Sequence, residues 1–291
     1  MPRTFLTALP LCFALVGLYA CSSLDPLDPP DNTGGTTGTA GTAGTAGTAS
    51  TGTGGTGGGG QGGSGAGVPV GCTDPTAVPC SDEVFLGMNL QADIAPGLIT
   101  SDAVATGFLS MIDATAGGPF TTDPDSYVYG RFTDSGLVKV EISDEDSLDS
   151  MEWDIAFRRY VVRINSKYSG PSCVTAARVP GAGTYDELTA VPDGLNFRED
   201  DYFTPSCELI PDGSGLENSP ATALSGYWTY PGCVSMSGHV YVLALADNRN
   251  VKILFESYYS PTVQAQCDAN GTIPMQDSGA ANFRVRWAFL P

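Results

Sequence analysis

The chain has a single histidine, His239, and this limits the catalytic chemistry that its sequence can support. A Ser-His-Asp or Cys-His arrangement uses an imidazole as its base, so any such site would have to include His239. The sequence contains neither a Gly-x-Ser-x-Gly turn nor a phosphate-binding Gly-x-x-x-x-Gly-Lys-Ser/Thr loop. A carboxylate pair for glycoside hydrolysis stays open, because the chain has 32 Asp and Glu residues. We therefore predict that the protein is not an enzyme, with a hydrolase of extracellular polymers as a distant alternative.

A basic segment in the middle of the chain is the second place where chemistry could reside. It follows the Trp-Asp-Ile-Ala-Phe stretch at 153–157, and residues 157–165 are rich in Val, Ile and Tyr, which predicts one strand. Strand side chains alternate between two faces, so Arg159 and Arg163 would share a face. Such a pair can bind a carboxylate through bidentate hydrogen bonds, whereas in an acidic protein arginines more often neutralise nearby Asp and Glu. Both interpretations stay open.

The chain is strongly acidic, with a formal net charge of −19. Surfaces that bind nucleic acid are basic, so we expect no nucleic-acid partner. Asp144-Glu145-Asp146 together with Asp149 could supply oxygen ligands to Ca²⁺. The segment lacks the glycine-punctuated spacing of an EF-hand loop, and we expect a solvent-exposed acidic turn instead.

The N-terminal residues have the features of a secretory signal. Arg3 precedes an apolar run at 5–20 that is too short for a resident transmembrane helix. The run ends in Leu18-Tyr19-Ala20-Cys21, which resembles the lipobox of bacterial lipoproteins, so residues 1–20 are the predicted signal peptide and Cys21 the predicted lipidation site. A cysteine that only ends an ordinary signal peptide is the alternative. Ser22-Ser23 do not resemble the Asp-containing signal for inner-membrane retention, so we expect an outer-membrane lipoprotein that faces the cell surface or the periplasm.

The mature chain divides into a tether and one globular head. Residues 21–69 are dominated by Gly, Thr, Ala and Ser, include a Thr-Ala-Gly repeat at 39–47, and have no pattern that would form a core. Such a segment behaves as a flexible coil. Residues 70–291 are long enough to fold around one hydrophobic core.

Six cysteines remain for the head once Cys12 is removed with the signal and Cys21 is lipidated. In an exported domain they predict three disulfides, for which 15 connectivities exist. None of them has the close Cys-x₂₋₄-Cys spacing of structural zinc sites, which disfavours zinc. Cys72 and Cys80 bracket a proline-containing loop, which favours a bond between them. A predicted hairpin lies between Cys233 and Cys267, which favours the second pair. By elimination, the third expected pair is Cys173–Cys207.

The patterning of the head predicts an all-β, mostly antiparallel fold with one or two short helices. Strands that flank turn residues predict two hairpins, and an alternating segment predicts a final strand. These segments are 127–132 with 137–142, 240–245 with 251–255, and 283–289.

Helices and loops have weaker signals. Ser101-Asp102 could cap an apolar pattern, which predicts a helix at 101–114, and a second short helix is predicted near 185–188. Residues 193–226 read as a loop, where a ligand site is most easily built.

The order and spacing of these segments resemble the HmuY-like haem-binding lipoproteins, all-β haemophores that are anchored at the outer membrane or secreted. The match covers about 125–291, weakly between 195 and 230, and is strongest at 151–160, Met-Glu-Trp-Asp-Ile-Ala-Phe-Arg-Arg-Tyr. Further matching positions are Arg163, Asn165, Ser169-Gly170, 190–194, 240–259 and 283–291. The resemblance implies a HmuY-like head that captures haem and passes it to an outer-membrane haem receptor.

The best-known members of this family hold haem between two histidines, and this chain has neither. The first position follows a Pro-Asp-Gly, which here is Pro211-Asp212-Gly213 and is followed by Ser214. The second lies a few residues after a Trp, here Trp228, and no histidine follows at that spacing. The resemblance therefore implies haem ligation of another kind.

Three side chains are the candidate haem ligands, because haem iron accepts His, Met or Tyr. They are Met236, His239 and Tyr230, and each also has an ordinary structural interpretation as a packed or exposed side chain. Under the same resemblance Arg159 and Arg163 would contact the haem propionates. The alternative function is a surface interaction or structural lipoprotein that keeps the fold and does not bind haem.

Overall fold

The computed structural model describes residues 68–115, 126–181, 184–216, 219–274 and 278–291. These residues belong to one compact unit, Gln61–Pro291. The predicted signal peptide, Cys21 and nearly all of the predicted tether lie outside the described residues, and the predictions made for them remain predictions. Within the described ranges, no helix has the length and apolar character needed to cross a bilayer.

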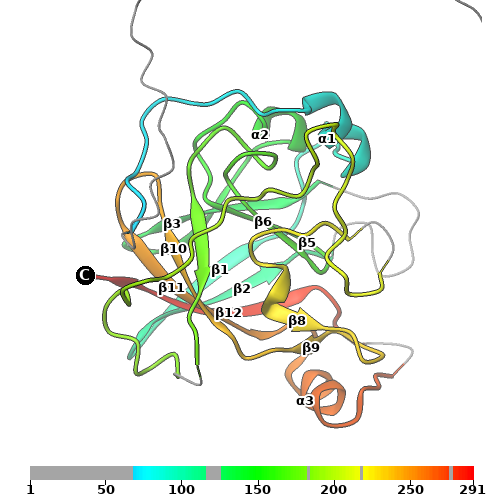
Figure 1. Cartoon of the computed structure of the whole chain (residues 1–291). Coiled ribbons are helices and arrows are strands. Elements are labelled where there is room, and N and C mark those ends of the chain that lie inside the picture. Colours follow the sequence, from blue (N-terminus) through cyan, green and yellow to red (C-terminus); the bar gives the residue numbers. More distant parts are fainter. Residues whose placement is uncertain (1–67, 116–125, 182–183, 217–218, 275–277) are drawn as a thin grey trace, which may run out of the picture. The chain divides into compact units, whose positions relative to one another are not determined.

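A six-stranded antiparallel sheet forms the larger layer of the head (Figure 1). Its strand order is β1-β2-β12-β11-β10-β7, so the C-terminal strand lies inside the sheet and β7 forms an edge. The hairpin predicted at 240–255 and the predicted final strand are both present. The strands are β1 (Ile99–Val104), β2 (Gly107–Asp113), β7 (Thr175–Arg178), β10 (Val240–Ala244), β11 (Asn250–Ser257) and β12 (Asn282–Leu290).

A four-stranded antiparallel sheet of order β4-β3-β5-β6 forms the second layer, and β8 pairs with β9 in a short ribbon. The hairpin predicted at 127–142 is present as β3 and β4. The predicted all-β, mostly antiparallel fold is confirmed. The remaining elements are α1 (Ser81–Gly87), β3 (Val128–Thr133), β4 (Gly136–Val140), α2 (Asp144–Ser147), β5 (Ile155–Arg158), β6 (Val161–Ile164), the 3₁₀ turn η1 (Ser225–Tyr227), β8 (Trp228–Thr229), β9 (Ser235–Met236) and α3 (Pro261–Asn270).

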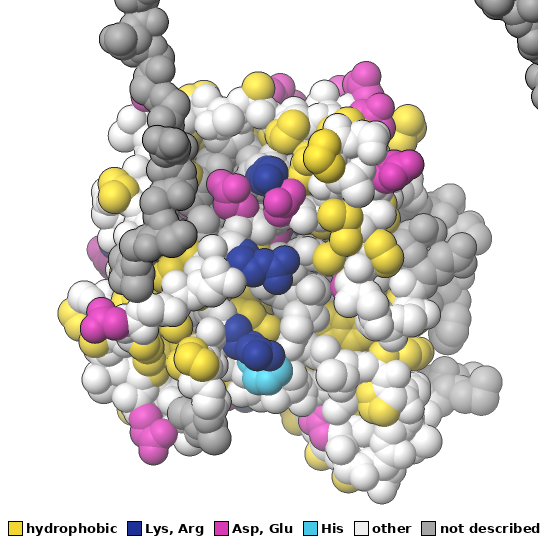
Figure 2. All heavy atoms as spheres, in the orientation of Figure 1, with side chains coloured by type: hydrophobic (Ala, Val, Ile, Leu, Met, Phe, Trp, Pro, Cys, Tyr) yellow, Lys and Arg dark blue, Asp and Glu magenta, His cyan; other side chains and the backbone are white. Residues whose placement is uncertain are grey.

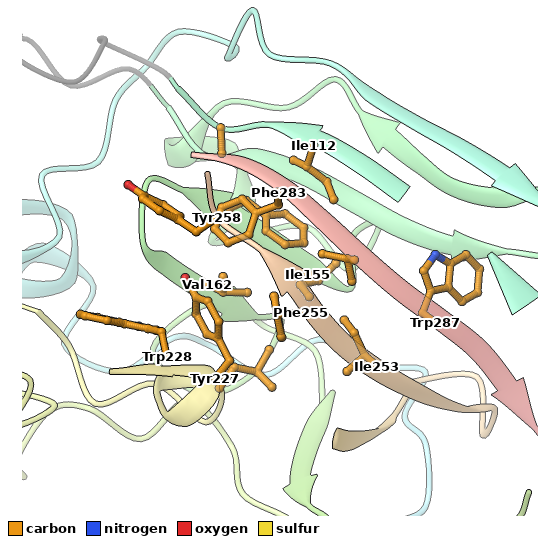
Figure 3. Close-up of a cluster of buried hydrophobic side chains, with 14 of the residues drawn as sticks. Ile112, Ile155, Val162, Tyr227, Trp228, Ile253, Phe255, Tyr258, Phe283 and Trp287 are labelled. Carbon is orange, nitrogen blue, oxygen red and sulfur yellow. The ribbon is translucent and has the colours of Figure 1, made fainter. Parts of the chain in front are cut away.

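The main hydrophobic core lies between the two sheets (Figure 3). In β12 the side chains of Phe283, Val285 and Trp287 are buried and the arginines between them are only partly buried, as the alternation of a strand requires. Ring centroids of Phe283 and Phe157 lie 5.3 Å apart, and those of Trp287 and Phe132 lie 4.8 Å apart. Burial of each such ring contributes about 1.5–3 kcal/mol, so these contacts hold β3 and β5 against β12.

The helix predicted at 101–114 is wrong, because this segment forms the β1–β2 hairpin. Gly107 has a φ of +123° at the turn, and a Cβ there would lie 2.2 Å from the carbonyl oxygen of Trp287. Phe108 stacks on Trp287 with a centroid separation of 4.7 Å. Pairing of β2 with β12 therefore overrides the local helical pattern. The helix predicted near 185–188 is also wrong, because those residues form a turn that is fixed by a hydrogen bond from the Tyr185 hydroxyl to the carbonyl of Thr106.

The single strand predicted at 157–165 is likewise wrong. It splits into β5 and β6, which pair as a hairpin with Arg158 opposite Val161. Arg159 has a φ of +50° in the turn between them. Arg159 and Arg163 therefore do not share a face of one strand.

The disulfides differ from the prediction in two of three cases. The pair Cys233–Cys267 is confirmed. The predicted pairs Cys72–Cys80 and Cys173–Cys207 are wrong, and the structure contains Cys72–Cys173 and Cys80–Cys207.

The path of the chain before α1 explains this exchange of partners. The N–H of Cys72 donates to the carbonyl of Ala246, and the N–H of Thr76 donates to the carbonyl of Pro171. The segment therefore lies along the head, and its two cysteines meet residues that are 101 and 127 positions away in sequence.

Peptide mapping of the unreduced protein should recover these three cross-links and no Cys72–Cys80 peptide. A cross-link that closes a longer loop removes more entropy from the unfolded chain. The sequence separation is 101 for Cys72–Cys173 and 34 for Cys233–Cys267. Replacing the first pair with serine should therefore lower the free energy of unfolding by about 1 kcal/mol more than replacing the second, measured in urea. Equal losses would contradict this expectation.

Candidate functional site

Arg163 is fully buried on the face of the smaller sheet that is turned away from the main core. Its guanidinium lies 4.0 Å from the centre of the Tyr127 ring, and Nη2 donates a 2.6 Å hydrogen bond to the Tyr129 hydroxyl. Burial by itself lowers the pKa of Arg163, but the surrounding tyrosines and Asp144 raise it above its ordinary value, so the group stays charged. This corrects the prediction that Arg163 contacts a ligand carboxylate, because the side chain is not accessible. Arg159 is half-buried in the β5–β6 turn.

Asp144 is buried beside this arginine, which corrects the predicted exposed acidic turn at this one residue, whereas Glu145, Asp146 and Asp149 are exposed as predicted. Its Oδ1 accepts hydrogen bonds from the N–H of Tyr127 at 2.7 Å and from the hydroxyl of Tyr129 at 2.8 Å. Its Oδ2 lies 3.6 Å from Nη1 of Arg158. Asp144 therefore has interior partners and is not directed at a solvent cation.

Asp200 is the second buried carboxylate of this region. It accepts hydrogen bonds from the N–H of Ile164 at 2.9 Å, the hydroxyl of Ser169 at 2.6 Å and the N–H of Ala223 at 2.8 Å. Burial raises its pKa to about 6, against the opposing effect of these hydrogen bonds and of Arg163. Asp200 thereby joins β6 to the two ends of the long loop that precedes η1.

His239 lies at the start of β10 and is half-buried. Its Nδ1 is 3.0 Å from the carbonyl oxygen of Gly226 in η1. A carbonyl can only accept, so Nδ1 carries the proton, and in the neutral ring Nε2 has a free lone pair. A pocket of about 390 Å³ opens beside His239, and its lining includes Val179, Val240 and Leu254. This is the arrangement of an imidazole held by one nitrogen and able to bind a metal with the other.

The two other predicted ligands lie elsewhere. Met236 belongs to the β8–β9 ribbon, is partly buried against the main core, and donates its N–H to Asp268. Tyr230 is 44% exposed, and its ring lies edge-on to that of Trp228 with centroids 6.3 Å apart. Neither lines the pocket beside His239. The structure therefore does not bring the three candidates together.

The sequence did not identify two exposed arginines near His239, Arg178 and Arg198. Arg178 of β7 lies opposite Tyr241 of β10, and Arg198 forms an isolated bridge with Ala176 of β7. Burial raises the pKa of Tyr241 to about 12, and the positive charges of Arg178 and Arg198 act in the opposite direction. Figure 2 shows Lys and Arg side chains in a line on this face, with the chain's histidine against the lowest. No sequence signal marks them, because Arg178 and Arg198 are far apart in the chain and meet only through pairing.

One cluster in the described part of the chain has metal-ligand geometry: Cys80, Glu83 and Cys207. Cys80 and Cys207 form a disulfide, so neither offers a thiolate, and the cluster does not form a metal site.

Comparison with known proteins gives a fold-level resemblance. No family model and no curated protein matches the chain. Among solved structures, a protein described as HmuY-like and haem-binding from Bacteroides vulgatus is 20% identical, with a TM-score of 0.40 over 67% of this chain and 96% of its own. A protein described as a lipoprotein from Bacteroides fragilis is 16% identical, with a TM-score of 0.40 over 68% and 94%. The apo HmuY analogue of Tannerella forsythia is 14% identical, with a TM-score of 0.35 over 68% and 99%.

The resemblance to HmuY-like proteins that the sequence predicts is thus found again by structural comparison. At TM-scores of 0.40 and below, this resemblance concerns the fold alone.

The buried carboxylate of Asp154 should make the stability of the protein depend on pH. Its Oδ2 accepts the N–H of Phe132 at 2.8 Å, and burial raises its pKa from 3.8 to about 6. A raised folded-state pKa contributes stability that is present below about pH 4 and is lost as the pH rises through about 6. Asp154→Asn keeps the acceptor and removes the charge. At pH 7.5 this variant should be up to about 3 kcal/mol more stable than the wild type, the equivalent of two pKa units.

At pH 3 the two proteins should unfold at similar urea concentrations, because Asp154 is then protonated in the folded wild type and in most of the unfolded wild type. A stability difference that is the same at pH 3 and pH 7.5 would contradict the raised pKa.

Proposed function

We propose that the protein is a non-enzymatic lipid-anchored protein of the outer membrane whose head binds haem through one axial histidine, His239. The function is haem capture for delivery to an outer-membrane receptor. The observation that carries the proposal is the hydrogen bond between Nδ1 of His239 and the Gly226 carbonyl, which leaves Nε2 as a ligand beside a pocket. A single histidine is sufficient for haem, as in globins and peroxidases.

The residues around His239 are compatible with a haem edge. The pocket has apolar lining residues, Val179, Val240 and Leu254, beside polar ones that include Thr184 and Ser237, and its volume of about 390 Å³ is within the range of small-molecule sites. Haem iron would supply the ligand-binding centre, and His239 would hold it through Nε2. A site open on one side fits a carrier, since a carrier has to release its ligand.

The ligand assignment is tested by haemin titration of the head, residues 70–291, followed at the Soret band. We expect saturable binding by the wild type, and a loss of affinity of at least tenfold with an altered Soret band in His239→Ala. Met236→Leu and Tyr230→Phe are matched controls and should retain the wild-type spectrum, because neither side chain lines the pocket.

A spectrum that changes in Met236→Leu or Tyr230→Phe and not in His239→Ala would reassign the ligand. An unchanged spectrum in all three variants would remove all of these ligand assignments.

A second candidate function, a surface interaction protein, is favoured by a groove of about 750 Å³ beside α1. Its apolar lining includes Phe85, Leu148 and Leu86, and Leu86 is 77% exposed. Its acidic lining residues are Asp82, Glu145 and Asp149, and it is lined by no Lys or Arg. Figure 2 shows hydrophobic and acidic side chains together over the region where α1 lies in Figure 1. An exposed apolar patch with an acidic rim fits a basic amphipathic segment of a protein partner.

Fluorescence anisotropy with a labelled synthetic peptide of alternating Lys and Leu tests this groove. Leu86→Ser should weaken binding about tenfold, because a leucine contact contributes on the order of 1.4 kcal/mol. Asp82→Asn with Asp149→Asn should weaken it further than the charge-matched control Asp102→Asn with Asp193→Asn. Equal effects of the two charge variants would show that the peptide responds only to the overall negative charge.

A further inference from the structure

We infer that Arg178 and Arg198 form a binding site for a ligand carboxylate, next to His239. For haem, whose two propionates are carboxylates, the inference rests on the function proposed above. For a free carboxylate it is independent of that function.

Neither of these two guanidinium groups has a protein partner in the part of the chain that the structure describes. In a chain with 13 Lys and Arg against 32 Asp and Glu, a cation next to an acid is the expected outcome. Within the described residues, the side chains of Arg178 and Arg198 donate no hydrogen bond and form no ion pair. The other described cations have partners: Arg131, Lys139, Arg158, Lys167, Arg249, Arg284 and Arg286 in ion pairs, Arg163 and Lys252 in hydrogen bonds, and Arg159.

The fold also places these two arginines together. Ala176 and Arg178 are two positions apart on β7, so their side chains share a face. Arg198 lies opposite Ala176, held by two 2.9 Å backbone hydrogen bonds, so it is directed to that same face. Diagonal neighbours of this kind lie about 7–8 Å apart, which two flexible guanidinium groups can span around one carboxylate or one small dicarboxylate.

The arginine pair also lies close to the residues that hold His239. Tyr241 lies opposite Arg178, and its hydroxyl is close to Gly226, where an added Cβ would meet it at 2.9 Å. The carbonyl of Gly226 is the group that holds Nδ1 of His239. The group that holds His239 thus lies close to the hydroxyl of the tyrosine opposite Arg178. A ligand with a metal centre and peripheral carboxylates has groups for both His239 and the arginine pair.

Metal-free protoporphyrin IX separates the carboxylate site from iron ligation, because it has the two propionates and no iron. Its binding to the head, followed by porphyrin fluorescence, should weaken at least tenfold in the double variant Arg178→Gln/Arg198→Gln. The charge-matched double variant Arg131→Gln/Arg284→Gln should bind like the wild type. The dimethyl ester of the porphyrin should bind the wild type and the Arg178→Gln/Arg198→Gln protein equally, and His239→Ala should leave metal-free porphyrin binding unchanged.

A parallel calorimetric titration with citrate tests whether the site binds a free carboxylate or the propionates of a porphyrin. Citrate binding that depends on Arg178 and Arg198, without porphyrin binding, would support the carboxylate site and reject haem as its ligand. Haemin binding that depends on His239 and not on the two arginines would keep the proposed function and overturn this inference. Equal binding of every carboxylate probe by the double variant and its charge-matched control would overturn it as well.

Discussion

A buried guanidinium, that of Arg163, is the constraint on which the arrangement of the site depends. Burying a charge is tolerated only when neighbouring groups compensate for the loss of water, and removing one partner of such a group costs about 3–5 kcal/mol. The rings of Tyr127 and Tyr129 and the carboxylates of Asp144 and Asp200 provide this compensation. These groups come from β3, α2 and the loop after β7, so one charge ties three separate segments to β6.

Asp200 connects this buried arginine to the segments that form the candidate site. This carboxylate is fixed by hydrogen bonds to Ile164 of β6 and Ala223, and it follows Arg198 by two positions. The same interactions therefore hold Arg198 against β7 and bring the chain back toward η1, where Gly226 meets His239. The stacking of Tyr227 on Phe255, with centroids 4.3 Å apart, then anchors η1 to β11 in the core. A loop that lacks regular structure over much of its length is thereby held at both ends.

The sequence was sufficient for the parts of the fold that rest on local patterns. The hairpins β3–β4 and β10–β11 and the final strand follow from alternation and turn residues, and the described residues between 193 and 224 belong to no helix or named strand, as predicted. The failures arise where long-range pairing decides. Residues 101–114 have a helical pattern locally, but β12 offers a strand partner. Cys72 and Cys80 are neighbours in sequence, but the chain between them lies along the head. Arg159 and Arg163 are separated by a turn that a two-residue hairpin requires, and a Val-rich segment gives no sign of it.

Some residues of the candidate site could be identified from the sequence, and others could not. His239 was identifiable as the single histidine, although its hydrogen bond to Gly226, 13 positions earlier, depends on the intervening residues that form the β8–β9 ribbon and its flanking turns. Arg178 and Arg198 could not be identified, since their proximity follows from a bridge between a sheet edge and a loop. Arg163, which the sequence pattern favoured, is fully buried beside Tyr127, whereas Arg178 and Arg198 are exposed at the β7 edge of the larger sheet.

The most direct test of this account is a crystal structure of the head grown with haemin. The account predicts iron at Nε2 of His239, with the porphyrin carboxylates within hydrogen-bonding distance of Arg178 and Arg198. Iron bound to Met236 or Tyr230, or crystals grown in excess haemin in which the surface around His239 holds no porphyrin, would contradict it.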